Sequence, residues 1–171
     1  MTNTKVATPY ISVAASTIAA VAFACVLHQF ALAFSLVFLV PAAIYDQRER
    51  ILPDGLVLPG MGGALFIAAL SGHSFAAAYG CGIGMLALSV MFWARPQSVG
   101  LGDVKLVGAI GAALGPAVMI ATATASMIGV VMLLQRGADR KAGVAMGWPW
   151  VIGSLVAAAF GTFTPWHFLL P

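Results

Sequence analysis

The chain has 171 residues, of which 61% are hydrophobic and 8% are charged, with a net charge of +3 and a mean hydropathy of +1.01. Soluble domains carry about 25% charged residues, so the composition excludes a soluble protein of this size. The few basic residues are dispersed between apolar runs, which excludes a nucleic-acid partner. We expect one integral membrane domain over residues 1–171.

Seven apolar runs follow one another and predict an all-α polytopic membrane protein with about seven transmembrane helices, within a range of six to eight. The runs cover residues 10–27, 29–45, 55–71, 75–93, 104–115, 117–134 and 148–166. A spanning helix needs about 20 residues, so the stretch 104–134 is too long for one. We expect a break at Gly115–Pro116, because proline lacks an N–H and disfavours helix in the residue before it. The short run 104–115 need not span the bilayer completely.

The charged residues predict the orientation of the chain. If the N-terminus is cytoplasmic, segments 1–9, 46–54, 94–103 and 135–147 lie on the same side. They hold all five acids and all Lys and Arg except Lys105, which lies at the edge. The turns near His28, residues 71–74 and Gly115 carry no charge. The positive-inside rule therefore predicts a cytoplasmic N-terminus.

Aromatic and sulfur-containing residues suggest no cofactor. Trp93, Trp148, Trp150 and Trp166 lie near the ends of apolar runs and are expected at the lipid headgroups. Cys25 and Cys81 lie within apolar runs without a Cys-x-x-Cys pair, and we expect both to be small buried hydrophobes. The three histidines are dispersed, so no metal site is predicted.

Two aspartates suggest chemistry. Asp46 ends the second run, and Asp103 precedes the fifth run in Gly100-Leu101-Gly102-Asp103. The predicted topology puts both at one depth on one side. Paired carboxyl groups can share a proton, so that one activates water and the other donates to a carbonyl, as in aspartic proteases. Taken alone, each aspartate also fits a helix boundary, and Asp103 fits an N-cap.

Four further residues are candidates for supporting this pair. Gly100 and Gly102 are expected to shape the loop that delivers Asp103, because glycine permits sharp bends and close approach. Lys105 either pairs with Asp103 or with an acid of the substrate, or extends to the membrane surface as a basic anchor. Asp54 either caps the third helix or supports the site electrostatically.

Two segments resemble the type IV prepilin peptidases. Residues 45–59 are similar to their first catalytic segment and read Tyr-Asp-Gln-Arg-Glu-Arg-Ile-Leu-Pro-Asp-Gly-Leu-Val-Leu-Pro. Residues 100–115 are similar to their second and read Gly-Leu-Gly-Asp-Val-Lys-Leu-Val-Gly-Ala-Ile-Gly-Ala-Ala-Leu-Gly. The resemblance implies an aspartic endopeptidase of the bacterial inner membrane, with Asp46 and Asp103 as catalytic residues. It would serve pilus biogenesis or protein secretion by cleaving prepilin or pseudopilin precursors on the cytoplasmic side, after a glycine, without a cofactor or metal.

The sequence departs from the family pattern in two places. Bifunctional members carry an N-terminal region with paired cysteines and methylate the new N-terminus. Nine residues precede the first apolar run here, and no Cys-x-x-Cys is present. We therefore expect the short peptidase-only branch, with no zinc or methyltransferase region and no S-adenosylmethionine. The family's Pro-Phe-Gly-Pro segment is replaced by Gly147-Trp148-Pro149-Trp150-Val151, which we expect to alter the substrate groove without touching the aspartates.

Two other functions remain open. Presenilin-like intramembrane proteases place an aspartate of a Tyr-Asp motif in mid-helix, and Tyr45-Asp46 fits that motif superficially. The basic segment after Asp46 argues instead for a boundary position. A non-enzymatic small transporter or membrane assembly subunit is the other alternative, although no further acid lies inside an apolar run to carry protons.

Overall fold

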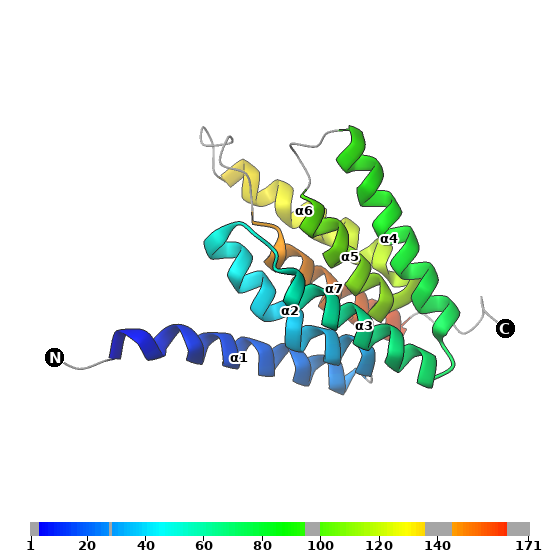
Figure 1. Cartoon of the computed structure of the whole chain (residues 1–171), viewed down its shortest axis with the longest axis horizontal. Helices are drawn as coiled ribbons and strands as arrows, with labels where there is room; N and C mark the ends of the chain where they lie inside the picture. The colour runs from blue at the N-terminus through cyan, green and yellow to red at the C-terminus, as the bar shows by residue number, and fades with distance from the viewer. Residues whose placement is uncertain (1–3, 28, 95–99, 136–144, 164–171) are drawn as a thin grey trace.

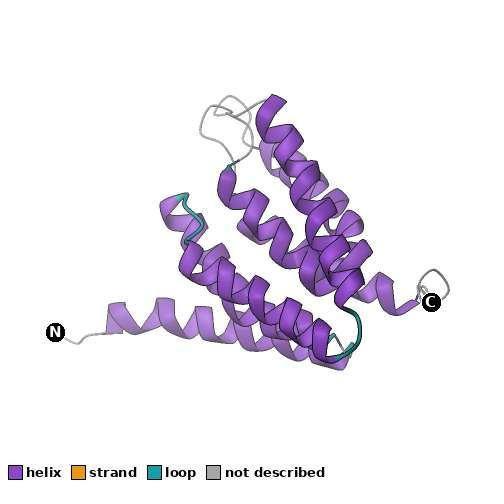
Figure 2. Cartoon of the chain, turned by 45° about the vertical axis from the view of Figure 1, so that its right-hand side comes forward, coloured by secondary structure: helices purple, strands orange, loops and turns teal. Residues whose placement is uncertain are grey.

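The computed structural model describes residues 4–27, 29–94, 100–135 and 145–163, and the side chains among them at 12–27, 29–94, 100–135 and 145–160. These ranges are helical almost throughout and contain no strand (Figure 2). In chain order the helices are α1 Thr4–Val26, α2 Phe30–Glu49, α3 Asp54–Leu70, α4 Ser74–Ala94, α5 Leu101–Leu114, the 3₁₀ turn η1 Gly115–Ala117, α6 Val118–Gln135 and α7 Gly147–Phe163. Figure 1 shows their arrangement.

The all-α membrane class predicted from the apolar runs is confirmed. Three helical stretches are long and apolar enough to cross a membrane: Phe30–Glu49, Ser74–Ala94 and Leu101–Gln135. Shorter apolar helices cover Ser12–Val26, Asp54–Leu70 and Gly147–Phe160. Each predicted run coincides with one helix, whereas seven complete crossings and a cytoplasmic N-terminus stay predictions.

The predicted break after α5 is present. The chain passes from α5 through η1 into α6, and Gly115 adopts a φ of 58°. Glycine adopts this left-handed conformation without a steric penalty, and Pro116 fits the first positions of the following turn. Both residues therefore stop α5 and start α6 at a fixed point.

Helices α4 and α5 pack closely through glycines. A Cβ added at Gly111 would overlap the carbonyl group of Gly80, and one added at Gly80 would overlap the carbonyl groups of Gly111 and Gly115. Small residues allow the backbones of membrane helices to approach in this way. The spacing Gly111-x-x-x-Gly115 thus serves packing within the chain.

We expect Gly111→Ala to lower the free energy of unfolding by about 1–3 kcal/mol, because overpacking forces the backbones of α4 and α5 apart. Unfolding of the purified protein in detergent measures the effect. Gly82→Ala is the matched control on α4, since nothing lies within 4 Å of an added Cβ there. Alanine is favoured over glycine in a helix by about 1 kcal/mol, so the control should be neutral or stabilising. Equal stability of the two variants would contradict the packing.

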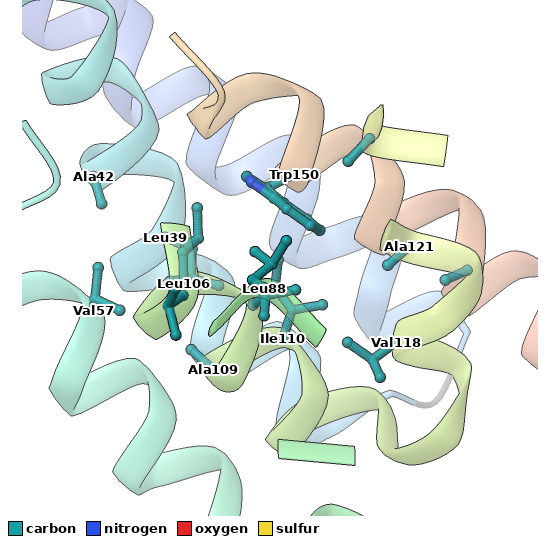
Figure 3. Close-up of a cluster of buried hydrophobic side chains, with 14 residues drawn as sticks. Leu39, Ala42, Val57, Leu88, Leu106, Ala109, Ile110, Val118, Ala121 and Trp150 are labelled. Atoms are coloured by element: carbon teal, nitrogen blue, oxygen red, sulfur yellow. The ribbon is translucent and has the colours of Figure 1, made fainter. Parts of the chain in front are cut away.

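The fold brings several helix ends to one end of the bundle. In Figure 1 the C-terminal ends of α2, α4 and α6 and the N-terminal ends of α3, α5 and α7 lie together, opposite the α3–α4 turn. A core cluster runs beneath these ends and includes Leu39 of α2, Leu106 and Ile110 of α5, and Trp150 of α7 (Figure 3). Because α2, α5 and α7 share this core, it fixes the ends that carry the two aspartates.

Candidate active site

Asp46 lies in the last turn of α2 and is 7% exposed. The helix continues to Glu49, so Asp46 precedes the helix end instead of forming it. Its Oδ2 accepts a hydrogen bond at 3.0 Å from the backbone N–H of Gly147, the first residue of α7. A buried carboxyl group needs such a partner, because losing its water contacts is costly. The N-terminus of α7 therefore holds Asp46.

This contact corrects the expectation that the Gly147–Val151 segment does not touch the aspartates. Gly147 reaches α2 because it has no side chain: an added Cβ would lie 2.6 Å from the Cα of Ala43 and 3.0 Å from its Cβ. The sequence feature that could have pointed to this contact is the combination of Gly147 and Pro149 at the start of the last apolar run. A hydrogen bond between residues 101 positions apart is not visible in one sequence.

Asp103 is the third residue of α5, and its Oδ2 accepts a hydrogen bond at 3.2 Å from the N–H of Gly100. Gly100 is the N-cap residue, so the alternative that Asp103 caps the helix from the N-cap position is wrong. Its carboxyl group bonds back to the N–H of the N-cap residue, as the third residue of a capping box does. A negative charge in the first helical turn is also favoured by the helix dipole.

The structure brings the two aspartates within electrostatic range. Asp46 is one of the charges that act on the Asp103 carboxyl group, and the Trp150 side chain lies near the same group. Two carboxylates at close range repel each other when both are ionised. The carboxyl groups of Asp46 and Asp103 therefore interact with each other at this end of the bundle.

Trp150 corrects the prediction that the tryptophans lie at the lipid headgroups. It is 2% exposed, next to the aliphatic core residues in Figure 3. Its Nε1 is buried and has no hydrogen-bond partner within 3.5 Å in the described part of the chain, although the side chain lies near Asp103. Trp93 is 86% exposed, as expected for an anchor, and Trp166 lies outside the described residues. An indole N–H is thus available at the pair.

The two glycines before Asp103 lie where close approach requires them. A Cβ added at Gly102 would lie 2.9 Å from the Cβ of Leu52, and one added at Gly100 would lie 3.3 Å from Oδ2 of Asp103. Glycine lets the start of α5 pack against the α2–α3 connection. Their role in shaping this loop stays a prediction.

Lys105 and Asp54 pair with each other. Nζ of Lys105 lies 2.8 Å from both carboxylate oxygens of Asp54, and the two side chains are 30% and 55% exposed. Lys105 therefore does not pair with Asp103 in this structure. The prediction that Asp54 caps α3 is wrong: Asp54 is the first helical residue, and the N-cap residue is Pro53, which has no side-chain cap bond. The ion pair instead joins α3 to α5.

We expect Lys105→Gln to change the free energy of unfolding by less than about 1 kcal/mol, because exposed ion pairs contribute little. Asp54→Asn and the double variant complete a thermodynamic cycle, measured by unfolding in detergent. A coupling energy well above 1 kcal/mol would contradict this. Loss of substrate cleavage in Lys105→Gln with stability kept would instead support the alternative that Lys105 contacts the substrate.

A pocket of about 250 Å³ lies between the end of α2, α6 and the start of α7. It is lined by Gln47 and Arg50 of the α2 end, Ile128 and Met132 of α6, and Ala145, Trp148, Pro149 and Ile152 at and before the start of α7. Gln47, next to Asp46 in sequence, and Pro149, next to Trp150, are part of its wall, but neither aspartate lines it. Among the described residues, no group of three His, Cys, Asp or Glu side chains is placed to hold a metal ion.

Comparison with known proteins identifies the family. The type IV leader peptidase family matches residues 33–134. A protein of Aeromonas salmonicida named prepilin leader peptidase/N-methyltransferase is 30% identical over 142 residues, which cover 75% of this chain and 49% of the relative. A protein of the same name from Xanthomonas campestris is 29% identical over 124 residues, covering 64% and 42%.

The chain thus spans about half the length of the curated relatives it matches. No solved structure matches it. The family match covers more than half of the chain and includes both aspartates, Gly100, Gly102 and Lys105. The resemblance seen in the sequence is confirmed, and the chain belongs to the type IV leader peptidase family.

Proposed function

We propose that this chain is an aspartic endopeptidase that removes the leader peptide of type IV prepilin-like precursors. One observation carries the proposal: Asp46 and Asp103, on separate helices of a family member, lie within electrostatic range at one end of the bundle. The names of the relatives supply the substrate class. The bond from Gly147 to Asp46 supports a pair that is held in place.

The proposed reaction uses the pair as a unit. The ionised carboxylate takes a proton from water, whose oxygen attacks the scissile carbonyl carbon, while the protonated carboxyl group donates to the carbonyl oxygen. Collapse of the tetrahedral intermediate breaks the C–N bond, and the leaving nitrogen takes up a proton from the pair. Either carboxyl group can fill either role in this scheme.

Three N–H groups surround the pair and suit this chemistry. Gly147 donates to Asp46, Gly100 donates to Asp103, and the indole N–H of Trp150 lies near Asp103. Donors that are fixed before the reaction stabilise charge without reorganising. We propose that they keep the carboxyl groups oriented while a proton moves between them.

We further propose a single multi-pass domain in the bacterial inner membrane, with seven crossings, a cytoplasmic N-terminus and the aspartates facing the cytoplasm. The three candidate spans and the common end of α2, α5 and α7 support this topology. Four of the basic residues behind the orientation, Arg95, Arg136, Arg140 and Lys141, lie outside the described residues. The absence of methyltransferase activity stays a prediction, because the relatives are named for both activities.

Co-expression with a prepilin whose leader ends in glycine before its apolar helix tests the function. We expect a shortened precursor with its new N-terminus directly after that glycine and without a methyl group, both read from one mass spectrum. Cleavage inside the apolar helix would favour the presenilin-like alternative. An intact precursor, with the protein folded and inserted, would favour the non-enzymatic alternatives and overturn the proposal.

A further inference from the structure

Three sulfur atoms from two helices converge at the middle of the bundle, away from the aspartates. Sγ of Cys81 in α4 lies 3.8 Å from Sδ of Met85 in the same helix and 4.0 Å from Sδ of Met61 in α3. We propose that Cys81, Met61 and Met85 form a binding site for a soft monovalent metal ion of the Cu(I) class. This site does not depend on the proposed peptidase activity.

The distances fit a metal ion between the sulfurs. A zinc–sulfur bond is about 2.3 Å long, and three sulfurs held at that length around an ion in one plane lie about 4.0 Å apart. The separations of Cys81 Sγ from the sulfurs of Met61 and Met85 match this value. Residues 81 and 85 share one face of α4, because side chains four positions apart in a helix are neighbours.

Helix α5 closes the site from a third side. A Cβ added at Gly108 would lie 2.8 Å from Sδ of Met85 and 3.6 Å from Sδ of Met61. Both thioethers therefore lie over the bare backbone of Gly108, and this glycine lets them stay near Cys81. The three sulfur-bearing side chains are only partly buried, so the cluster is reachable from the surface of the bundle.

The donor set determines the class of ion. Thiolate and thioether ligands prefer Cu(I) over hard cations, which take oxygen ligands. An isolated charge is costly within a membrane. A monovalent cation bound to one thiolate and two neutral thioethers gives a site with no net charge. On binding, the S–H bond of Cys81 breaks, a metal–sulfur bond forms, one proton leaves to solvent, and the metal keeps its +1 state.

Titration of the purified, reduced protein in detergent with Cu(I), in competition with a chromogenic Cu(I) chelator, tests the site. We expect one equivalent to bind, with release of one proton and three sulfur ligands in X-ray absorption. Cys81→Ser should weaken binding by at least about 100-fold, since even outer-shell partners of metal ligands contribute about 10- to 100-fold. Met61→Leu and Met85→Leu conserve volume and should each reduce the sulfur count to two.

The chain offers a matched control for the thiol. Cys25 lies on α1 and is exposed, so the prediction that it is buried is wrong. Cys25→Ser should bind Cu(I) like the wild type. Ag(I), which has the same charge and does not undergo redox cycling, should compete for the same site. Equal binding by the wild type and Cys81→Ser, loss of binding in Cys25→Ser, or a single sulfur ligand in the wild type would overturn the proposal. Unfolding curves for each variant separate loss of the ligand from loss of the fold.

Discussion

Cleavage of a prepilin substrate is expected to fall by roughly 10²- to 10⁴-fold in both Asp46→Asn and Asp103→Asn, the range that a positioned acid or base contributes. Asparagine keeps the size of the side chain and an acceptor oxygen, so Asp46→Asn can still accept the N–H of Gly147. What each variant loses is the exchangeable proton of the pair. Initial rates on a purified precursor in detergent measure the effect.

Glu49→Gln is the matched control for these variants. Glu49 is exposed, lies three positions after Asp46 in the last turn of α2, and faces the same end of the bundle. It should cleave within about two-fold of the wild type, because exposed charges interact weakly through solvent. The double aspartate variant should be no slower than either single one, since groups that act as a unit are not additive. Substantial cleavage in either single variant would refute the assignment.

Local sequence was sufficient to predict the helices. Apolar length predicted each helix, and Gly115–Pro116 predicted the break between α5 and α6, because backbone conformation and desolvation of the chain are local properties. The same reasoning predicted that Asp46 and Asp103 share one end of the bundle, since two helices, the third and the fourth, lead from the end of the second to the start of the fifth. The family resemblance added the chemistry that topology alone left open.

The contacts between helices were not predictable from local sequence. Lys105 was expected to pair with Asp103 or a substrate acid, or to anchor at the membrane surface, whereas the packing of α3 against α5 pairs it with Asp54. Trp150 is a residue type that often anchors helices at the membrane surface, yet its position on α7 places its side chain in the core. Every residue except proline has a backbone N–H, so the sequence does not mark Gly147 as a donor. Its bond to Asp46 depends on how closely α7 approaches α2. Of these contacts, those of Gly147 and Trp150 reach the two aspartates.

Gly147→Ala is the second change from which we expect a large effect. The added Cβ would lie 2.6 Å from the Cα of Ala43, and the start of α7 must move away from α2 to accept it. The move lengthens the 3.0 Å hydrogen bond to Asp46. Hydrogen bonds to charged groups contribute about 1.5–3 kcal/mol, which corresponds to roughly a 10- to 150-fold loss in rate if the bond is fully used in the transition state.

Two measurements separate this effect from simple overpacking. Gly55→Ala, near the start of α3 at the same end of the bundle, has nothing within 4 Å of the added Cβ and should keep both stability and cleavage. Gly147→Ala should lose about 1–3 kcal/mol of stability and should also lose cleavage under conditions where the protein is fully folded. A folded Gly147→Ala variant that cleaves like the wild type would show that the bond to Asp46 is dispensable. The short distance between α2 and α7 would then serve packing alone, and the orientation of Asp46 would have to come from the helix that carries it.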